Sequence, residues 1–241
     1  MFRDNGSHKT YHRSGSTMTL FARTSIAAAA ALFSGLAAAA SIGGLVNTGA
    51  GQSTGSTDTN YKYTATGNAA GLSGFGVVSN GNADPFPSWL PNTSSSSWLI
   101  PGADQNTNYS PTGNSTFTWT LNFDLTGFDA SSASFSGHWA ADNNGVLLLN
   151  GVAISSISGQ RGYADWTSFS ASSGFLAGVN TLQFVVTDTV DQTYNFTGLR
   201  AEFLSSNVNA AVAPAVPEPH TYALMLAGLG ALGFIARRRR S

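Results

Sequence analysis

The sequence of 241 residues has room for one ordinary domain with processing segments at its ends. Only 10% of the residues are charged, which excludes a coiled coil and a typical helical cytosolic enzyme. The near-neutral total hides a segregation of charge. Residues 41–219 hold three cations and eleven acids, a net charge of −8. This balance excludes binding of DNA through counterion release, but it is compatible with calcium or neutral glycans.

The first 40 residues have the pattern of a leader. An apolar run from Ile26 to Ala40, IAAAAALFSGLAAAA, follows Arg23 and ends in small residues. A positive flank, a short apolar stretch and an Ala-x-Ala end predict a secretory signal peptide with cleavage after Ala40. A buried core helix is the alternative interpretation. Met18 is an alternative start, because MTLFAR by itself makes an adequate charged leader.

Residues 61–206 alternate between apolar and polar with a period of two, which is typical of β-strands. From Thr116 to Asp124, TFTWTLNFD, the aromatic and leucine side chains take one face and the threonines the other. Further apolar runs lie at 133–141, 146–149, 180–188 and 199–204. Turn sequences separate them. We therefore predict an all-β domain, an antiparallel β-sandwich of jelly-roll type, after a Gly/Ser/Thr-rich segment at 41–60.

Several stretches of this body occur in a familiar order. They are SWLIP at 97–101, FTWTLNFDLTGF at 117–128, GHWAADNNG at 137–145, LNG at 149–151 and GVNTLQFVV at 178–186. The series resembles the galactose-binding-like jelly roll of many exported bacterial proteins and carbohydrate-binding modules. Members of that fold bind sugars, lipids or proteins, and many only pack. The resemblance therefore implies a fold and leaves the ligand open.

The sequence offers little for catalysis. It has no cysteine, which excludes thiol chemistry, thiolate metal sites and disulfides. Only His138 and His220 follow the leader, and we expect His138 at the surface or a strand edge. Acids at turns are more typical of turn stabilisation than of a paired-carboxylate glycosidase site. We predict no catalytic residues and no enzyme.

The tryptophans are assigned from the alternation. Trp119 and Trp139 fall on faces expected to form the core. Trp89 and Trp98 lie in a Pro/Ser-rich segment and are predicted to cover the sandwich as lids.

A first candidate binding site lies in a segment without clean alternation. It combines Tyr163 and Trp166 with the cation of Arg161 and the carboxylate of Asp165. Aromatic rings stack on sugar rings, and planar cations and carboxylates bond to sugar hydroxyls. Packing at the core or rim of the domain is the alternative role for these four residues.

A second candidate site is acidic. Asp142, Asn144, Asp188 and Asp191 lie at predicted strand ends. Calcium takes six to eight oxygen ligands from such carboxylate and amide side chains. The loop is too short for an EF-hand, and a hairpin turn stabilised by Asx hydrogen bonds is the alternative. Calcium is therefore a speculative cofactor at this stage.

The C-terminal segment has the pattern of a targeting signal. An Ala/Pro/Val-rich linker at 207–216 precedes Pro217, Glu218 and Pro219. The apolar run at 221–236 is followed by four arginines, Arg237, Arg238, Arg239 and Arg240. Sixteen helical residues span about 24 Å, which is workable across a membrane if the arginines snorkel. By the positive-inside rule the arginines place this end in the cytoplasm.

The order of Pro-Glu-Pro, apolar span and arginine cluster resembles the PEP-CTERM sorting signal of Gram-negative bacteria. The resemblance covers residues 217–241, with His220 where the family often has Ser or Thr. It implies recognition by an exosortase, a membrane-embedded cysteine transpeptidase that cuts near the motif. The body would then reach the cell surface or extracellular matrix after transient anchoring in the inner membrane. A plain membrane anchor without processing is the alternative.

Three functions remain open. The first is an exported surface or matrix protein whose jelly roll contacts exopolysaccharide. The second is a structural or adhesive surface protein with no discrete ligand. The third, more distant, is an exported hydrolase. The expected partners are the secretion machinery, the exosortase and the membrane, with exopolysaccharide under the first function and no nucleic acid.

Overall fold

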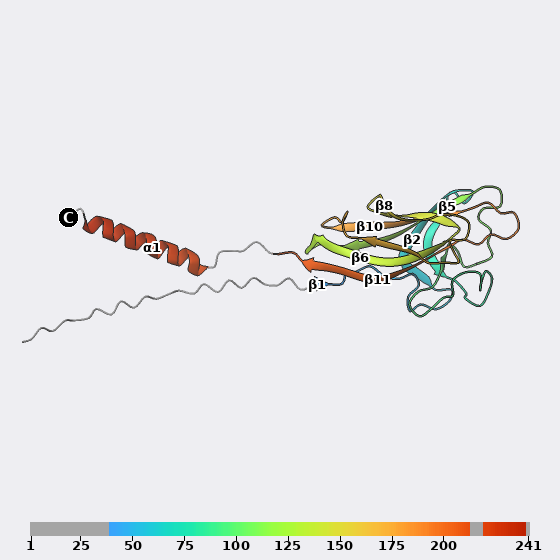
Figure 1. Cartoon of the computed structure of the whole chain (residues 1–241), viewed down its shortest axis with the longest axis horizontal. Coiled ribbons are helices and arrows are strands. Elements are labelled where there is room, and N and C mark those ends of the chain that lie inside the picture. The colour runs from blue at the N-terminus through green and yellow to red at the C-terminus, as the bar shows by residue number, and fades with distance from the viewer. Residues whose placement is uncertain (1–38, 213–218, 240–241) are drawn as a thin grey trace, which may run out of the picture. The chain divides into compact units, whose positions relative to one another are not determined.

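The computed structural model describes residues 39–212 and 219–239 (Figure 1). The predicted leader up to residue 38, Pro217, Glu218 and Arg240 lie outside the described residues. Within the described residues the chain forms eleven strands and one helix. The strands are β1 (Ala39–Ala40), β2 (Thr57–Gly67), β3 (Ser73–Val78), β4 (Leu99–Ile100), β5 (Ser115–Asp124), β6 (Phe128–Asp142), β7 (Asn144–Leu149), β8 (Val152–Ile157), β9 (Thr167–Ala171), β10 (Val179–Asp188) and β11 (Gly198–Ala210).

The predicted all-β architecture is confirmed as a single antiparallel sheet that folds over on itself. Its strand order is β8-β7-β10-β5-β2-β3-β4-β11-β6-β9, and β1 pairs with β11. The short strand β4 joins β3 to β11. The two outermost strands of this order, β8 and β9, are in contact: the Ser155 hydroxyl of β8 donates to the Ser168 carbonyl of β9 at 3.0 Å. The result is a sandwich whose two layers are continuous through β4.

The alternation read from the sequence sets the inner face of this sandwich. Phe117, Trp119, Leu121 and Phe123 of β5 are all buried, as predicted for one face of that strand. In an antiparallel pair, residues directly opposite share a face. Phe184 of β10 faces the core in this way. It contacts two rings of the facing layer, Trp139 at 5.6 Å and Phe169 at 6.4 Å between centroids. Trp119 and Trp139 are core residues, as expected.

The body extends beyond the predicted end of the sandwich. β11 continues to Ala210, within the segment interpreted as a linker. Its last residues stay in the sheet because they pair on both sides, with Ala39 and Ala40 of β1 and with Phe128 and Asp129 of β6. Ala40, the predicted last residue of the leader, is therefore part of a strand in this chain.

A second, smaller apolar cluster lies outside the main core and confirms the predicted lids. The indoles of Trp89 and Trp98 are buried, with ring centroids 4.2 Å apart. They come from the loop at residues 79–98 and pack with Ile100 and Ala140. Gly198 at the start of β11 permits this contact, since a Cβ there would come within 2.7 Å of the Trp89 ring. The loop thus covers part of the outer face of β4, β11 and β6.

A buried arginine holds the loop on the sheet. Arg200 of β11 donates from Nε to the Ser96 hydroxyl at 2.6 Å and from Nη1 to the Pro91 carbonyl. Nη2 donates to Thr93 Oγ1 and to Glu202 Oε1, both at 3.2 Å. Burial lowers the pKa of Arg200, and Glu202 opposes that effect. The guanidinium therefore joins three points of the loop to β11.

The C-terminal run forms the helix α1 (Pro219–Arg238), so the predicted helix is confirmed. Within residues 39–212 and 219–239, however, no helix is both long and apolar enough to cross a membrane. This finding corrects the predicted membrane span at 221–236. The apolar run is shorter than the roughly 20 residues that a bilayer core requires, and its three glycines lower its hydropathy.

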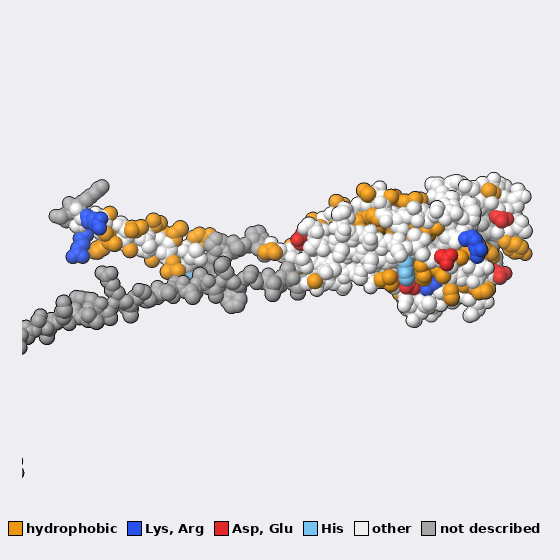
Figure 2. All heavy atoms as spheres, viewed as in Figure 1, with side chains coloured by type: hydrophobic (Ala, Val, Ile, Leu, Met, Phe, Trp, Pro, Cys, Tyr) orange, Lys and Arg blue, Asp and Glu red, His pale blue; other side chains and the backbone are white. Residues whose placement is uncertain are grey.

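The surface of the body matches its composition. Figure 2 shows one face on which most atoms belong to uncharged polar side chains or the backbone, with charged groups only at scattered points. Such a surface is built from the Ser, Thr, Asn and Gly residues that alternate with the core side chains.

We expect removal of the Arg200 guanidinium to destabilise the body strongly. In Arg200→Met the side chain keeps its bulk, but the loop acceptors and Glu202 lose their donor. The free energy of unfolding should fall by about 2–4 kcal/mol, as measured by urea denaturation of the full chain. Arg161→Met, at an exposed arginine, is the matched control and should change stability by about 0.5 kcal/mol or less. Equal effects of the two substitutions would contradict a structural role for Arg200.

Candidate functional site

A cleft of about 440 Å³ lies at one end of the sandwich and is the best candidate site. Its lining comes from four separate chain segments: the loop before β4, the end of β6, the β8–β9 connection and the β10–β11 connection. The lining residues are Pro85, Ser88, Trp89, Asp142, Asn143, Gln160, Tyr163, Thr189, Val190, Asp191, Tyr194, Asn195 and Phe196. We call this hollow the end cleft.

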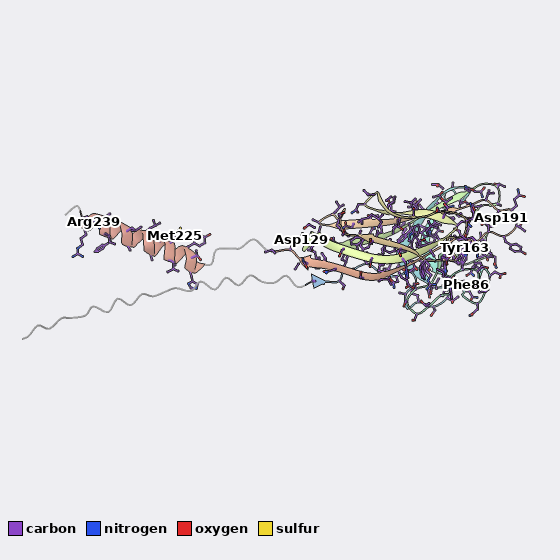
Figure 3. The ribbon with its side chains drawn as sticks, viewed as in Figure 1. Phe86, Asp129, Tyr163, Asp191, Met225 and Arg239 are labelled. Atoms are coloured by element: carbon purple, nitrogen blue, oxygen red, sulfur yellow. The ribbon has the colours of Figure 1, made fainter. Side chains whose placement is uncertain are left out.

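Strand register explains why these segments meet. Asp142, the last residue of β6, is opposite Gly198, the first residue of β11. Asn144 at the start of β7 is opposite Thr187, next to the end of β10. Four strand ends therefore coincide, and their connections crowd together. Figure 3 shows Phe86, Tyr163 and Asp191 at this end of the body and Asp129 at the other.

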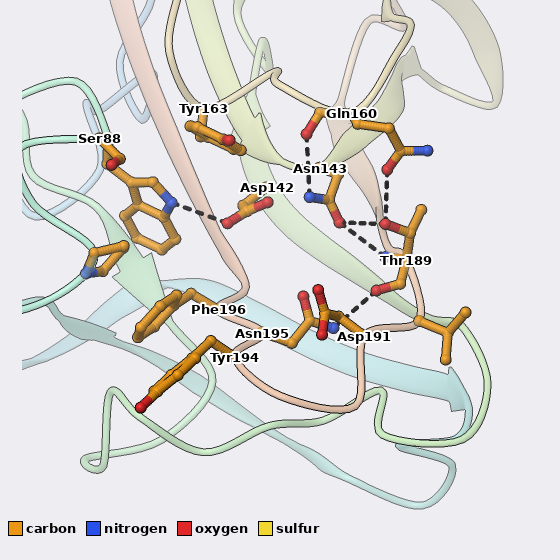
Figure 4. Close-up of a pocket in the computed structure, with 13 residues that line it drawn as sticks. Ser88, Asp142, Asn143, Gln160, Tyr163, Thr189, Asp191, Tyr194, Asn195 and Phe196 are labelled. Atoms are coloured by element: carbon orange, nitrogen blue, oxygen red, sulfur yellow. Dashed lines mark hydrogen bonds between the residues drawn. The ribbon is translucent and has the colours of Figure 1, made fainter.

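Hydrogen bonds between the connections hold the end cleft in shape (Figure 4). Asn143 donates from Nδ2 to the Gln160 carbonyl at 3.2 Å, and its Oδ1 accepts from the Thr189 amide at 2.9 Å and hydroxyl at 2.8 Å. The Asn195 amide donates to the Thr189 carbonyl at 2.8 Å. The same few residues thus join the β6–β7, β8–β9 and β10–β11 connections, so the cleft does not need a ligand to form.

Two buried carboxyl groups lie at the base of this region. Trp89 Nε1 donates to Asp142 Oδ2 at 2.9 Å, and the Ser110 hydroxyl donates to Asp188 Oδ2 at 2.7 Å. Burial raises the pKa of Asp142 to about 8, and the nearby charge of Asp188 adds to that rise. Burial likewise raises the pKa of Asp188 to about 7, although Ser110 and Asn195 act in the opposite direction. These hydrogen bonds therefore offset only part of the pKa rise that burial causes in each carboxyl.

The walls of the end cleft are aromatic. Trp89 is buried and its indole donates to Asp142, whereas Tyr163 and Phe196 are half-buried. Tyr194 is 76% exposed. The exposed ring of Tyr194 can stack on a ligand. The neighbouring amide and carboxylate side chains can form hydrogen bonds with the same ligand.

The structure separates the residues of the first candidate site. Only Tyr163 lines the end cleft, while Arg161 and Asp165 border a different hollow with Thr167. Trp166 lies over the outer face of the sheet, stacked on His138 at 3.9 Å, with the Arg200 guanidinium 4.7 Å from its ring. Trp166 therefore packs against β6 and β11, and it also lines a separate hollow with Pro91 and Thr93.

His138 is held at this surface by a carboxylate. Its Nε2 lies 3.0 Å from Glu202 Oε2, and Glu202 also pairs with Arg200 at 3.2 Å. The side chain of His138 is 21% exposed, as expected for a histidine on the outer face of its strand.

The predicted calcium residues are only partly brought together. Asp142 and Asp188 lie close to one another, and Asp191 lines the end cleft. Asn144 begins β7 and is not among the lining residues; its neighbour Asn143 is. In the part of the chain that the structure describes, no group of three or more His, Cys, Asp or Glu side chains is placed to hold a metal ion.

Sequence reasoning missed Asn143, Gln160 and Tyr194 as lining residues. Tyr194 carried one usable signal, because it follows the acidic turn that contains Asp191. Asn143 and Gln160 carried no such signal, because their hydrogen bonds join connections that are far apart in the chain.

Comparison with known proteins identifies the C-terminal segment. Residues 215–240 match the PEP-CTERM protein-sorting motif. The chain is thus a protein that carries this sorting signal behind a β-sandwich body. No curated protein matches the chain.

Solved structures with related folds share little sequence with it. A family 35 carbohydrate binding module from an environmental isolate is 15% identical over 48% of this chain and 82% of that chain, with a TM-score of 0.24. Beta-glucosidase from Kluyveromyces marxianus in complex with glucose is 11% identical over 72% of this chain and 20% of its own, with a TM-score of 0.32. The GH31 alpha-xylosidase from Xanthomonas citri is 12% identical, with a TM-score of 0.29, and the match covers 63% of this chain and 16% of that one. Likenesses at this level carry no argument about function.

The raised pKa values predict an unusual dependence of stability on pH. A carboxyl whose pKa is about 4 when unfolded and near 7 or 8 when folded binds protons more readily in the folded state. Its contribution to stability is therefore lost as pH rises from about 4 to about 8, by at most about 1.4 kcal/mol per pH unit for each group. Urea denaturation of the full chain in a chelator measures this slope.

Asp142→Asn should remove one group's share of that slope, because the amide imitates the protonated acid. Asp165→Asn, at an exposed carboxylate, should leave the slope as it is. An unchanged slope in the Asp142 variant would show that Asp142 does not titrate in this interval.

Proposed function

We propose that this chain is an exported surface or matrix protein, sorted through its C-terminus, whose end cleft contacts neutral carbohydrate such as exopolysaccharide. One arrangement carries the proposal: the end cleft lies beside the first residue of strand β11, and the sorting motif follows the last residue of that strand in the chain. The galactose-binding-like jelly roll is the fold that we propose for the body, in keeping with its single folded-over antiparallel sheet.

The direction of β11 places the cleft relative to the point of attachment. The strand begins at Gly198, beside Asp142 of the end cleft, and ends at Ala210, close to the residues that lead to the motif. Its 13 residues span about 40 Å at roughly 3.3 Å each. A body attached through its C-terminal end therefore presents the cleft on the side away from that attachment.

The chemistry of the end cleft suits a saccharide. Tyr194 offers an exposed ring face, and Asp191 and Gln160 offer oxygen and amide groups for hydroxyls. Neither lysine nor arginine lines this cleft, and the body as a whole is acidic. Both features disfavour an anionic polymer and favour a neutral one.

Export and sorting complete the proposal. The leader at residues 1–40 directs the chain through the general secretion machinery, and an exosortase acts at Pro217, Glu218 and Pro219. The motif match at 215–240 supports this step. We infer a Gram-negative host and a final location at the cell surface or in the extracellular matrix.

A structural or adhesive protein with no discrete ligand is the second candidate. One observation favours it: Asn143, Gln160 and Thr189 bond to each other, so part of the polar lining is already satisfied. We propose that the chain is not an enzyme. Asp142 and Asp191 do both line the end cleft, so release of reducing sugar from the host polysaccharide is the assay for the hydrolase alternative.

Tyr194→Ala should weaken retention of the full chain on the host's exopolysaccharide about tenfold or more, because stacking on the exposed ring is lost. Affinity electrophoresis in gels that contain the polysaccharide measures the change. Phe75→Ala is the matched control, since Phe75 is also exposed but lies outside the end cleft. Unchanged retention in the Tyr194 variant, or equal loss in both, would favour the structural candidate.

Replacement of Pro217, Glu218 and Pro219 by alanine should prevent sorting while leaving the sandwich folded. The full chain should then stay unprocessed and fail to reach the surface, as measured by fractionation and immunoblotting in an exosortase-containing host. The wild-type chain in a host without exosortase should behave in the same way. Normal surface delivery of the triple variant would contradict sorting through the motif.

A further inference from the structure

Two buried carboxylate oxygens near the end cleft have no hydrogen-bond partner. They are Oδ1 of Asp142 and Oδ1 of Asp188. Among the described residues, the one other buried side-chain atom in this condition is Trp119 Nε1 in the core. Unsatisfied buried polar groups are rare in native proteins, and a water or an ion often accounts for them.

Among residues 39–212, no lysine, arginine or histidine forms an ion pair with either of these two carboxyls. Within residues 39–212 the ion pairs are those of Glu202 with His138 and with Arg200. Asp142 is 5% exposed and Asp188 is fully buried, and the strand ends that carry them lie side by side, since the Asn143 amide donates to the Thr187 carbonyl at 3.1 Å. Buried carboxylates are normally paired with a cation or coordinated to a metal ion. Each of these two acids has one neutral hydrogen-bond donor but no cationic partner among residues 39–212, so the pair is suited to a positive charge.

We propose that a divalent cation, calcium in particular, binds at the unbonded Oδ1 atoms of Asp142 and Asp188. These two carboxylates supply the charge, and neutral oxygens supply the rest of the coordination. Asn195, which also lines the end cleft, turns its amide N–H group toward Asp188, so water oxygens complete the coordination. Because Asp142 lines the cleft, both the ion and its remaining waters can enter from solvent.

The donor set selects among metals. Every candidate ligand is a carboxylate or water oxygen, which hard cations prefer. The nearest histidine in sequence, His138, is engaged with Glu202 and Trp166 on the outer face of the sheet. Calcium fits better than magnesium, because it accepts six to eight oxygens in irregular geometry, whereas magnesium demands a regular octahedron.

The competing occupant is the proton. A carboxyl group must lose its proton before its oxygens can bind a metal ion. Protons and a cation then compete for the same oxygens, and the cation should bind more tightly as pH rises. This competition separates a true site from general screening of an acidic surface by salt.

Thermal unfolding of the full chain tests the proposal without reference to any glycan. Millimolar calcium should raise Tm relative to a chelator, and it should do so more at pH 8.5 than at pH 6. Asp142→Asn and Asp188→Asn should each abolish the calcium response, whereas Asp165→Asn, at an exposed carboxylate, should keep it. A rise that is equal in all variants, or equal with sodium at matched ionic strength, would overturn the site.

A second measurement uses the wild-type chain and does not depend on how the variants fold. The Trp89 indole nitrogen lies 2.9 Å from Asp142 Oδ2, so excitation of tryptophan should sensitise the emission of terbium bound at this site. Calcium should displace the terbium with a stoichiometry of one. Absence of sensitised emission, together with no shift in Tm, would show that protons alone occupy the two carboxyls.

Discussion

The buried guanidinium of Arg200 is the interaction on which the functional end of this body depends. It donates to Pro91, Thr93 and Ser96 of one long loop and to Glu202 of its own strand. A loop rich in serine and proline has few apolar side chains of its own, so it needs such polar anchors to stay on a sheet. Once it is held there, Trp89 and Trp98 can pack against Ile100 and the outer face of β6.

The position of this loop determines the electrostatics of the end cleft. Trp89 covers Asp142 and donates one hydrogen bond to it, but the same cover removes the carboxyl from water. A single neutral donor does not repay the desolvation of a carboxylate, so the pKa of Asp142 rises. Asp188 is in the same situation beneath Ser110. Buried polar groups with an unsatisfied atom are rare in native proteins, and these two lie in or beside the lining of the end cleft.

The topology relates this region to the rest of the chain. β1 and the end of β11 pair at one end of the sandwich, and the end cleft is built at the other. The two ends of the body therefore leave the sheet together, and the connections at the far end carry no constraint from the chain termini. Such connections can vary without disturbing the core, which suits a module that is attached at one end and meets its partner at the other.

The sequence by itself determined the class of the fold and the address of the protein. Period-two alternation predicted β5 and the burial of Trp119 and Trp139, because the side chains of a strand alternate strictly between its faces. The sorting motif at 215–240 is a contiguous signal and needs no tertiary structure to be recognised.

Only the tertiary structure decided the site. It placed Tyr163 in the end cleft and Trp166 on His138, although only two residues separate them, because the chain turns between them. It also brought Trp89, Asn143 and Tyr194 together from three distant segments. Spacing along the chain carries no information about such contacts, because strand pairing and loop packing between remote segments create them.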